Sequence, residues 1–202
     1  MALTCCAEEV HQWERFRVES EWLPARLRCF IVGENPGSPK TAYFYEAKRA
    51  VPVRTILLRE LHRSRILAEP TLAAFRSAGF LFDHGIRCRL RKNEIGEERR
   101  LAQQYKSPRA TGAKHLERFL RDAATVWVQG YVARNAVSAP GSELPRDFSN
   151  ISRSPYPGQS REAPRFFVSR YLTRASSEEV VTIFREFARF WNRTNDGNDV
   201  PV

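Results

Sequence analysis

The sequence predicts an α/β protein, a three-layer α/β/α sandwich around a central, mainly parallel four-stranded sheet. Short apolar runs, of the kind found in strands buried on both faces, alternate with segments whose apolar residues recur at helical spacing. Such alternation is typical of a parallel sheet covered by helices. Hydrophobic residues make up 42% of the 202 residues, which is enough for one buried core. We therefore expect a single domain over residues 1–202.

In the first half of the chain, two apolar runs predict strands and three amphipathic segments predict helices. Val10, Trp13 and Phe16 lie three residues apart, on one face of a helix. The run LRCFIV ends at a Gly-Pro-Gly corner, and Gly79 ends a short helix. The expected elements are an N-terminal helix within residues 1–24 (over 7–22), a strand over 27–32, helices over 53–67 and 72–75, and a strand over 80–90 that runs into a basic loop.

The second half continues the alternation. Gly130 is expected to turn the third strand into a helix, and Ser176 and Glu179 form a capping-box pattern at the start of the last helix. Five prolines between residues 139 and 164 predict a long loop. The expected elements are a helix over 114–123, a strand over 125–132, a helix over 132–137, a strand over 165–172, a helix from 176 and a frayed tail over 193–202.

Ligands of such sheets bind at the carboxyl ends of the strands. This rule places three segments at one edge of the sheet: GENPG (33–37) after the first strand, DHGIRCR (83–89) at the second, and SRYLTR (169–174) after the fourth. Glycines at a corner let the backbone approach a ligand closely. We therefore expect the functional site at this edge.

The balance of charge indicates a polyanionic partner. Thirty-three Lys and Arg against 23 Asp and Glu give a formal net charge of +10, and arginines cluster within 87–92, 97–100 and 169–174. Binding a nucleic acid neutralises phosphates and releases counterions, so such clusters favour DNA or RNA as partner. The alternative is a generally basic surface that only keeps the protein in solution.

No apolar run approaches the roughly 20 residues of a membrane-spanning helix. The first residues turn acidic too early for a signal peptide. We expect no membrane contact and a cytoplasmic (nucleoid-associated) or otherwise intracellular location. Cys29 is expected in a buried strand, and the cysteines are expected to be reduced.

Three motifs resemble those of the uracil-DNA glycosylase superfamily. GENPG is similar to the GEAPG and GINPG motifs of two of its branches, FLFDHGIRCRL (80–90) to YITNVVKCRP, and TVWVQGYVARNAV (125–137) to VIVALGKxA. They occur in the family's order and cover roughly residues 25–190. The resemblance implies a three-layer α/β/α domain and a monomeric enzyme that flips uracil or a related damaged base out of DNA and hydrolyses its N-glycosidic bond.

The resemblance also implies roles for the glycine corner. Asn35 matches the amide that positions water in the GINPG branch, and Glu34 matches the Glu of GEAPG. One of the two would hold the attacking water, while Gly33, Pro36 and Gly37 bring backbone close to the base. Gly37 stands where a Tyr would exclude the thymine methyl group, which implies a broad choice of base. The alternative is a tight turn with a solvated Glu34.

Base-binding residues follow from the same comparison. Phe44 or Tyr45 would stack on the flipped base, the alternative being that both belong to the core. His84 stands on the family's base-reading Asn and Asp83 on its Thr. Neighbouring strand residues point to opposite faces, so Asp83 and His84 do not form a relay.

Two departures from the family matter. Cys88 matches only one ligand of the iron–sulfur cluster found in the GEAPG branch, and Cys5–Cys6 lacks the ligand spacing, so we expect no cluster, no metal and no other cofactor. SRYLTR replaces the family's HPSP. We expect Arg170 to stabilise the leaving base, Leu172 to enter the duplex as a wedge, and Ser169 and Arg174 to contact DNA.

Two other functions remain open. A divergent or inactive member would bind nucleic acid on the same scaffold without catalysis. An enzyme of free nucleotides or nucleosides would use GENPG as a phosphate cradle, but the corner lacks the Lys-Ser/Thr of a P-loop.

Overall fold

The computed structural model describes residues 17–35, 43–46, 49–87, 90, 92–104, 106–107, 114–137, 158–159 and 165–195. Within them a five-stranded sheet has the order β2-β1-β3-β5-β4. Four neighbouring strands are parallel, which confirms the predicted α/β class: β1 (Cys29–Gly33), β2 (Phe80–His84), β3 (Thr125–Gln129) and β5 (Phe166–Ser169). β4 (Gly158–Gln159), antiparallel to β5, lies in the segment predicted as a loop; the rest of 139–164 is outside the described residues.

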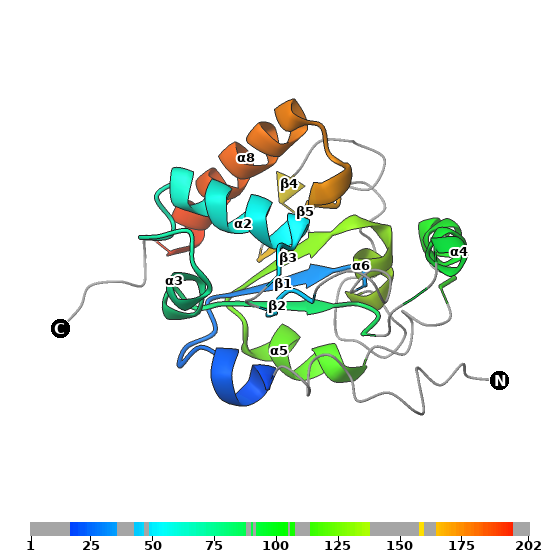
Figure 1. The fold of residues 1–202 in the computed structure, drawn as a ribbon, viewed down its shortest axis with the longest axis horizontal. Coiled ribbons are helices and arrows are strands. Elements are labelled where there is room, and N and C mark those ends of the chain that lie inside the picture. Colours follow the sequence, from blue (N-terminus) through cyan, green and yellow to red (C-terminus); the bar gives the residue numbers. More distant parts are fainter. Residues whose placement is uncertain are drawn as a thin grey trace.

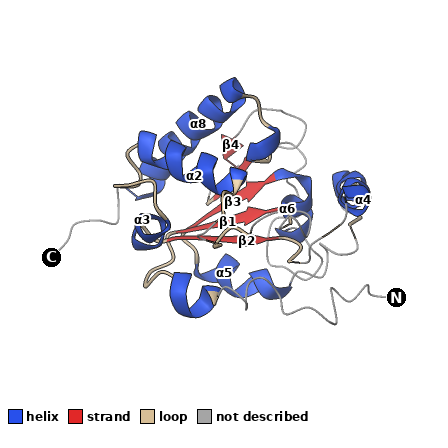
Figure 2. Ribbon diagram, viewed as in Figure 1, coloured by secondary structure: helices blue, strands red, loops and turns tan. Residues whose placement is uncertain are grey.

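Helices lie on both faces of the sheet, as Figures 1 and 2 show. α2 (Pro52–Arg63), α3 (Leu72–Ser77) and α8 (Ser177–Asn195) lie on one face, and α5 (Glu117–Asp122) on the other. α6 (Gly130–Val137) follows β3 directly, and α4 (Lys92–Gln103) packs against α6. Shorter turns are η1 (Val18–Trp22), η2 (Lys114–Leu116) and η3 (Leu172–Arg174).

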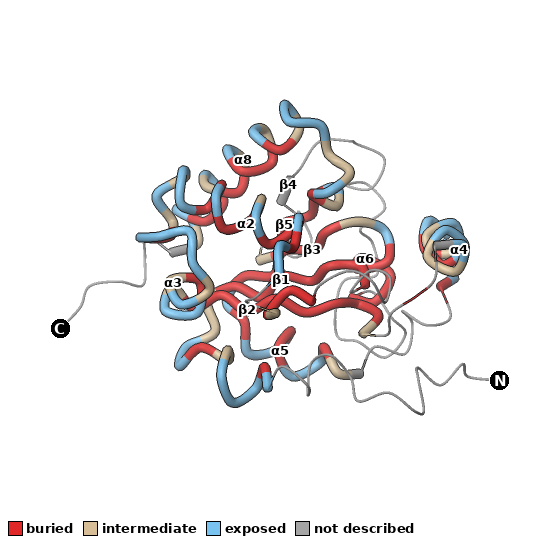
Figure 3. Tube along the Cα trace, viewed as in Figure 1, coloured by how far each residue is buried: buried red, intermediate tan, exposed pale blue. Residues whose placement is uncertain are grey.

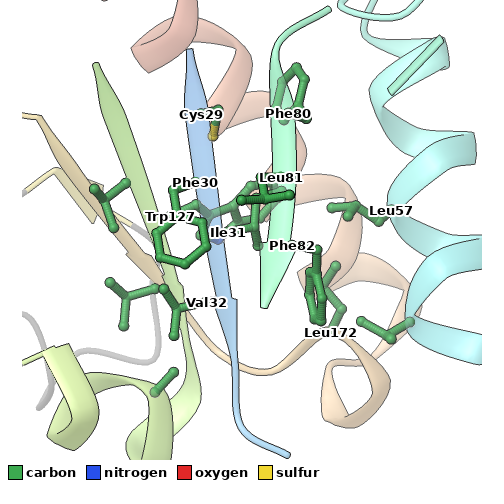
Figure 4. Packing of buried hydrophobic residues seen from close by; sticks show 14 of the residues in the cluster. Cys29, Phe30, Ile31, Val32, Leu57, Phe80, Leu81, Phe82, Trp127 and Leu172 are labelled. Carbon is green, nitrogen blue, oxygen red and sulfur yellow. The ribbon is translucent and has the colours of Figure 1, made fainter. Parts of the chain in front are cut away.

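The four parallel strands are buried along their whole length (Figure 3). Towards α8, Trp127 stacks on Phe187 with ring centroids 4.2 Å apart. Towards α5, Phe30 packs on Phe119 at 5.4 Å. Figure 4 shows the cluster of apolar side chains around β1, β2 and β3. Burial on both faces explains why these strands read as continuous apolar runs.

Local signals mark the helix starts. Pro52 opens α2, where its missing N–H costs nothing. The Thr71 hydroxyl accepts from the Ala74 N–H at the start of α3. The predicted capping box is confirmed: the Glu179 N–H donates to Ser176 Oγ (3.2 Å), and the Ser176 N–H donates to the Glu179 carboxylate (2.7 Å).

Several predicted boundaries were wrong. β2 ends at His84, and at the next residue, Gly85, the chain passes α6 so closely that a Cβ would lie 2.9 Å from Ala136 Cβ. β3 ends at Gln129, because Gly130, with a φ of 85°, begins α6. α2 ends at Arg63, shortly before Arg65 takes a positive φ of 59°.

The ends of the described chain differ from the prediction as well. Of the expected N-terminal helix, the described part is the single π-helical turn η1; residues 1–16 lie outside the description. α8 continues to Asn195, into the predicted frayed tail. Among the described helices, none is both long and apolar enough to cross a membrane.

Candidate functional site

Four side-by-side positions mark the carboxyl ends of the parallel strands. Gly33 at the end of β1 pairs with His84 at the end of β2, and Gln129 at the end of β3 pairs with Ser169 at the end of β5. The last aligned pair between β1 and β3 is Val32 and Val128, and Gly33 and Gln129 are the residues that follow them. Residues aligned across parallel strands point to the same face. The predicted meeting of GENPG, DHGIRCR and SRYLTR at one edge is therefore confirmed for their described residues.

Gly33 stands where no side chain fits. A Cβ there would lie 2.6 Å from Cζ of Phe82 and 3.4 Å from Nδ1 of His84. The predicted need for glycine at this corner thus has a cause within the sheet. The backbone beyond Gly33 is held against β2, because the Gly85 N–H donates to the Gly33 carbonyl (2.8 Å) and the Ile86 N–H to the Glu34 carbonyl (3.0 Å).

Glu34 is fully buried and held by two arginines from distant parts of the chain. Its Oε2 accepts from Nε of Arg99 on α4 (2.9 Å) and from Nη2 of Arg174 on η3. Its Oε1 has no hydrogen-bond partner among the described residues and lies against Gly130. A buried carboxylate needs such partners because desolvation of the charge is costly. The expected alternative of a solvated Glu34 was wrong.

The position of Arg99 depends on how α4 is fixed to α6. The Ser107 N–H donates to Oδ1 of Asn135 (2.9 Å), and the Ser107 hydroxyl donates to the buried Glu98 carboxylate (2.5 Å). From α6, the Arg134 guanidinium donates to the Ala102 carbonyl (3.3 Å). These contacts fix α4 to α6, and from there the Arg99 side chain reaches Glu34.

Asn35 follows Glu34 and is 93% buried, with 7% of its surface exposed. Its amide nitrogen has no hydrogen-bond partner within the described part of the chain. Buried polar groups in folded proteins are nearly always paired. An amide held in this way is available to a ligand or a water molecule. Pro36 and Gly37, the other predicted residues of the corner, lie outside the described residues.

The His84 imidazole is buried between two aromatic rings. It lies 5.0 Å from the Phe82 ring and 5.7 Å from the Tyr43 ring, centroid to centroid. Neither ring nitrogen has a hydrogen-bond partner among the residues described. Burial, followed by the nearby Arg87 and His115, lowers the pKa of His84 to about 3. The ring is thus neutral near pH 7, with one donor and one acceptor nitrogen.

Asp83 belongs to a separate polar cluster. Its carboxylate pairs with Arg87 (2.7 Å) and accepts from the backbone N–H of His84 (2.7 Å). Nε2 of His115 lies 2.9 Å from the His84 carbonyl oxygen. The Asp83 carboxylate contacts the backbone N–H of His84 and not the His84 ring. The prediction that the two residues form no relay is therefore confirmed.

The aromatic segment 43–46 lies along the outer edge of β2. Phe44 stacks on Phe82 with centroids 4.2 Å apart and planes 8° apart. The Tyr45 hydroxyl donates to the Phe82 carbonyl (3.0 Å) and accepts from the Phe82 N–H (2.8 Å), which satisfies the open edge of the sheet. The Arg54 guanidinium fixes the segment by donating to the Phe44 and Glu46 carbonyls.

Phe44 and Tyr45, the predicted stacking residues, are therefore engaged in the core, as their alternative interpretation had it. Of the aromatic residues in AYFY, the one whose ring lies beside His84 is Tyr43, which was not predicted. The spacing of this run alone does not show which of its aromatic rings faces the site. Which ring faces the site is set by the hydrogen bonds between Tyr45 and Phe82 of β2. Those hydrogen bonds have no local sequence signal.

The segment after β5 corrects two predictions. Leu172 is fully buried, and Figure 4 shows it within the apolar cluster near Phe82, so the prediction of a DNA wedge was wrong. A wedge has to reach the base stack from the surface. Arg170 forms an ion pair with Glu179 of α8 (2.8 Å). Within this segment, the arginine that reaches Glu34 after β1 is Arg174.

Ser169 holds this segment to the sheet. Its hydroxyl accepts from Nε1 of Trp127 (2.8 Å) and donates to the Arg170 carbonyl (3.0 Å). The Arg174 guanidinium also lies over the Tyr171 ring, 5.2 Å from its centroid. Burial and then the Glu34 carboxylate raise the pKa of Tyr171 above its ordinary value. Arg174 is therefore positioned by contacts on both sides.

Two residues of the site were missed from the sequence. Arg99 was missed because α4 was not predicted, although its run EERR was recognised as basic. Gln129 was missed because it stood inside the apolar strand predicted over 125–132, whose true end is Gln129. A polar residue directly before the glycine that ends a buried strand was the available signal.

No metal site is formed by groups of three or more His, Cys, Asp or Glu side chains within the described ranges. Cys5, Cys6 and Cys88 lie outside them, so the expected absence of an iron–sulfur cluster stays a prediction. Cys29 is buried in β1 as predicted, and burial raises the pKa of its thiol. Comparison with protein-family models gives no match, and comparison with curated proteins gives none either.

Proposed function

We propose that the protein is a DNA base-excision glycosylase that hydrolyses the N-glycosidic bond of uracil or a related damaged base. One observation carries the proposal. Asn35 and His84, the residues that the family resemblance assigns to water and base, are both buried with unpartnered polar atoms at the ends of adjacent parallel strands. Groups kept unpaired at such a cost are typical of ligand sites.

The proposed reaction needs few groups. The oxygen of a water molecule bonds to the sugar C1′, and the bond from C1′ to the base nitrogen breaks. The base leaves with the electron pair and takes up a proton, while the second product is the sugar hydroxyl. Positive charge develops on the sugar and negative charge on the base. Donors aimed at the base therefore lower the barrier.

Asn35 is the proposed water-holding residue, and neutral His84 the proposed donor to a base oxygen. Oε2 of Glu34 is occupied by two arginines, so Glu34 acts as a positioning residue that fixes the corner relative to α4 and η3. A neutral imidazole donates one hydrogen bond without adding charge to the unliganded site.

DNA is the proposed partner. The net charge of +10 supports it, as does the partial exposure of the arginines beside the site. The Arg99 and Arg174 side chains are 33% and 31% exposed, so their remaining donors can reach a phosphate. A monomeric, nucleoid-associated protein is the corresponding proposal for assembly and location. DNA binding is expected to weaken steeply with salt; binding that is insensitive to salt would contradict a phosphate-contacting partner.

A non-catalytic nucleic-acid-binding protein on the same scaffold is the second candidate. The observation in its favour is that Arg170, proposed to stabilise the leaving base, is paired with Glu179 instead. This function keeps the arginine surface but requires no water at Asn35.

Cleavage of an oligonucleotide with one uracil separates the two candidates. Asn35→Ala is expected to lower the rate by roughly 10²–10³-fold with DNA affinity retained, because losing one positioned hydrogen-bonding group at a reaction centre costs about that factor. Asn35→Asp keeps an oxygen that can orient water and is the matched control, expected to retain more activity than Asn35→Ala. A wild type that binds DNA but cleaves no damaged-base substrate would establish the second candidate.

A further inference from the structure

Gln129, at the end of β3, is a buried amide that the proposed reaction leaves without a role. None of its surface is exposed. Both its amide oxygen and its amide nitrogen have no hydrogen-bond partner among the described residues. The amide thus offers an NH2 group with two donor hydrogens and an acceptor oxygen, none of them paired within the described residues. Such a group is costly to keep inside a protein unless a ligand or a water molecule pairs with it.

The place of Gln129 in the sheet connects it to the candidate site. β1 lies between β2 and β3, so Gly33 separates His84 from Gln129 in the row at the carboxyl edge. Two strand spacings put the His84 and Gln129 Cα atoms about 10 Å apart, with both side chains on the same face. Gly33, between them, has no side chain, and the edge of the Phe82 ring lies against it. Two buried, unpartnered polar groups therefore flank the glycine corner.

A carboxamide and a neutral imidazole together can hydrogen-bond to a flat, uncharged ligand that carries both donors and acceptors. The amide matches a planar group in which a carbonyl stands next to an N–H, because donor and acceptor then pair side by side. This lactam edge occurs in uracil and in the oxo-purine hypoxanthine. An imidazole nitrogen can donate to a second acceptor of the same ring. The two groups together favour a heterocyclic base over a sugar or a phosphate.

We propose that Gln129 is a specificity-determining residue that pairs with the lactam edge of the base. The proposal rests on the proposed function, since it assumes that the ligand at this edge is a nucleobase. It adds that recognition comes from the third parallel strand as well as from His84 on β2. Bases whose N–H next to the carbonyl is blocked are expected to bind poorly.

Thr125 provides a matched control on the same strand. Its hydroxyl is also fully buried and unpartnered within the described residues, and it lies on the same face at the opposite end of β3. Thr125→Val and Gln129→Met each remove a buried polar group at nearly constant volume. Both are expected to keep or raise the melting temperature, by up to about 2–4 °C. Only Gln129→Met should affect the ligand.

The experiment measures binding of free uracil and of 3-methyluracil to wild type, Gln129→Met and Thr125→Val, together with uracil release from DNA. Wild type and Thr125→Val should bind uracil roughly 10–100-fold more tightly than 3-methyluracil, whose N–H is blocked. Gln129→Met should lose this preference and lower kcat/KM for uracil in DNA by a similar factor. A folded Gln129→Met protein that retains the preference would overturn the proposal while leaving the glycosylase function intact.

The remaining outcomes are equally decisive. Uracil binding that depends on Gln129 without any release from DNA would keep the base site and overturn the hydrolase. A wild type that neither binds any base nor releases one would overturn both. Loss of stability in Gln129→Met, with Thr125→Val unaffected, would show that the amide is paired within the protein and has a structural role only.

Discussion

Glu34 and Gly130 lie in direct contact at the centre of the candidate site. A Cβ at Gly130 would stand 2.6 Å from Oε1 of Glu34, and Gly130 has a φ of 85°. The end of β1 and the start of α6 therefore approach as closely as glycine allows. This contact ties the position of the GENPG corner to the residue that turns β3 into a helix.

The first prediction is that Gly130→Ala destabilises the protein and impairs the site. The new methyl group meets a buried carboxylate, and alanine disfavours this φ, so we expect a loss of roughly 1–3 kcal/mol in the free energy of unfolding. Urea denaturation measures it. Gly96→Ala in α4 is the matched control, because nothing lies within 4 Å of its Cβ; it is expected to stabilise by up to about 1 kcal/mol.

The second prediction concerns the ion pair between Glu34 and Arg174. Arg174→Met leaves the buried Glu34 carboxylate with Arg99 as its remaining partner among the described residues. We expect a loss of about 1–3 kcal/mol in the free energy of unfolding, less than for a fully buried pair because the Arg174 side chain is 31% exposed. Arg170→Met removes the exposed pair with Glu179 and should leave the free energy of unfolding nearly unchanged. Equal effects of the two substitutions would contradict the role given to Glu34.

Arg99 and Arg174 show how much of the site the sequence could predict. Local patterns predict the buried strands β1 and β2 and the glycine corner after β1. The parallel direction of the strands then brings the motifs to one edge of the sheet. Which arginine reaches Glu34 depends on how η3 turns and how α4 packs, and neither has a local signal. Leu172 shows the same limit, since only tertiary packing reveals that it is buried.

The third prediction is a pH dependence of stability caused by His84. Its pKa is lowered to about 3 in the folded protein, against about 6.5 when unfolded. Below pH 6.5 the unfolded chain binds a proton that the folded protein refuses, so stability is full above pH 6.5 and is lost as the pH falls towards 3. The slope contributed is up to about 1.4 kcal/mol per pH unit. Denaturation measures the free energy of unfolding at pH 7 and at pH 5. The difference between the two values should be smaller in His84→Gln than in wild type. An equal difference in the two proteins would argue against a buried neutral ring.

The fourth prediction tests the structural role of Tyr45. Tyr45→Phe leaves the N–H and carbonyl of Phe82 without the hydroxyl that pairs with both, and it should cost about 1–3 kcal/mol in the free energy of unfolding. Tyr131→Phe, at an exposed position, is the control and should be close to neutral. If Tyr45→Phe left stability unchanged but weakened base binding, Tyr45 would be a ligand residue after all.

The central claim is that the carboxyl edge of β1 and β2 hydrolyses an N-glycosidic bond with water held at Asn35. Single-turnover release of uracil from an oligonucleotide, compared between wild type and Asn35→Ala, tests it most directly. The account predicts release by wild type and a loss of roughly 10²–10³-fold in Asn35→Ala with DNA binding unchanged. Equal rates of release from the two proteins, or none from a wild type that is folded and bound to DNA, would contradict it.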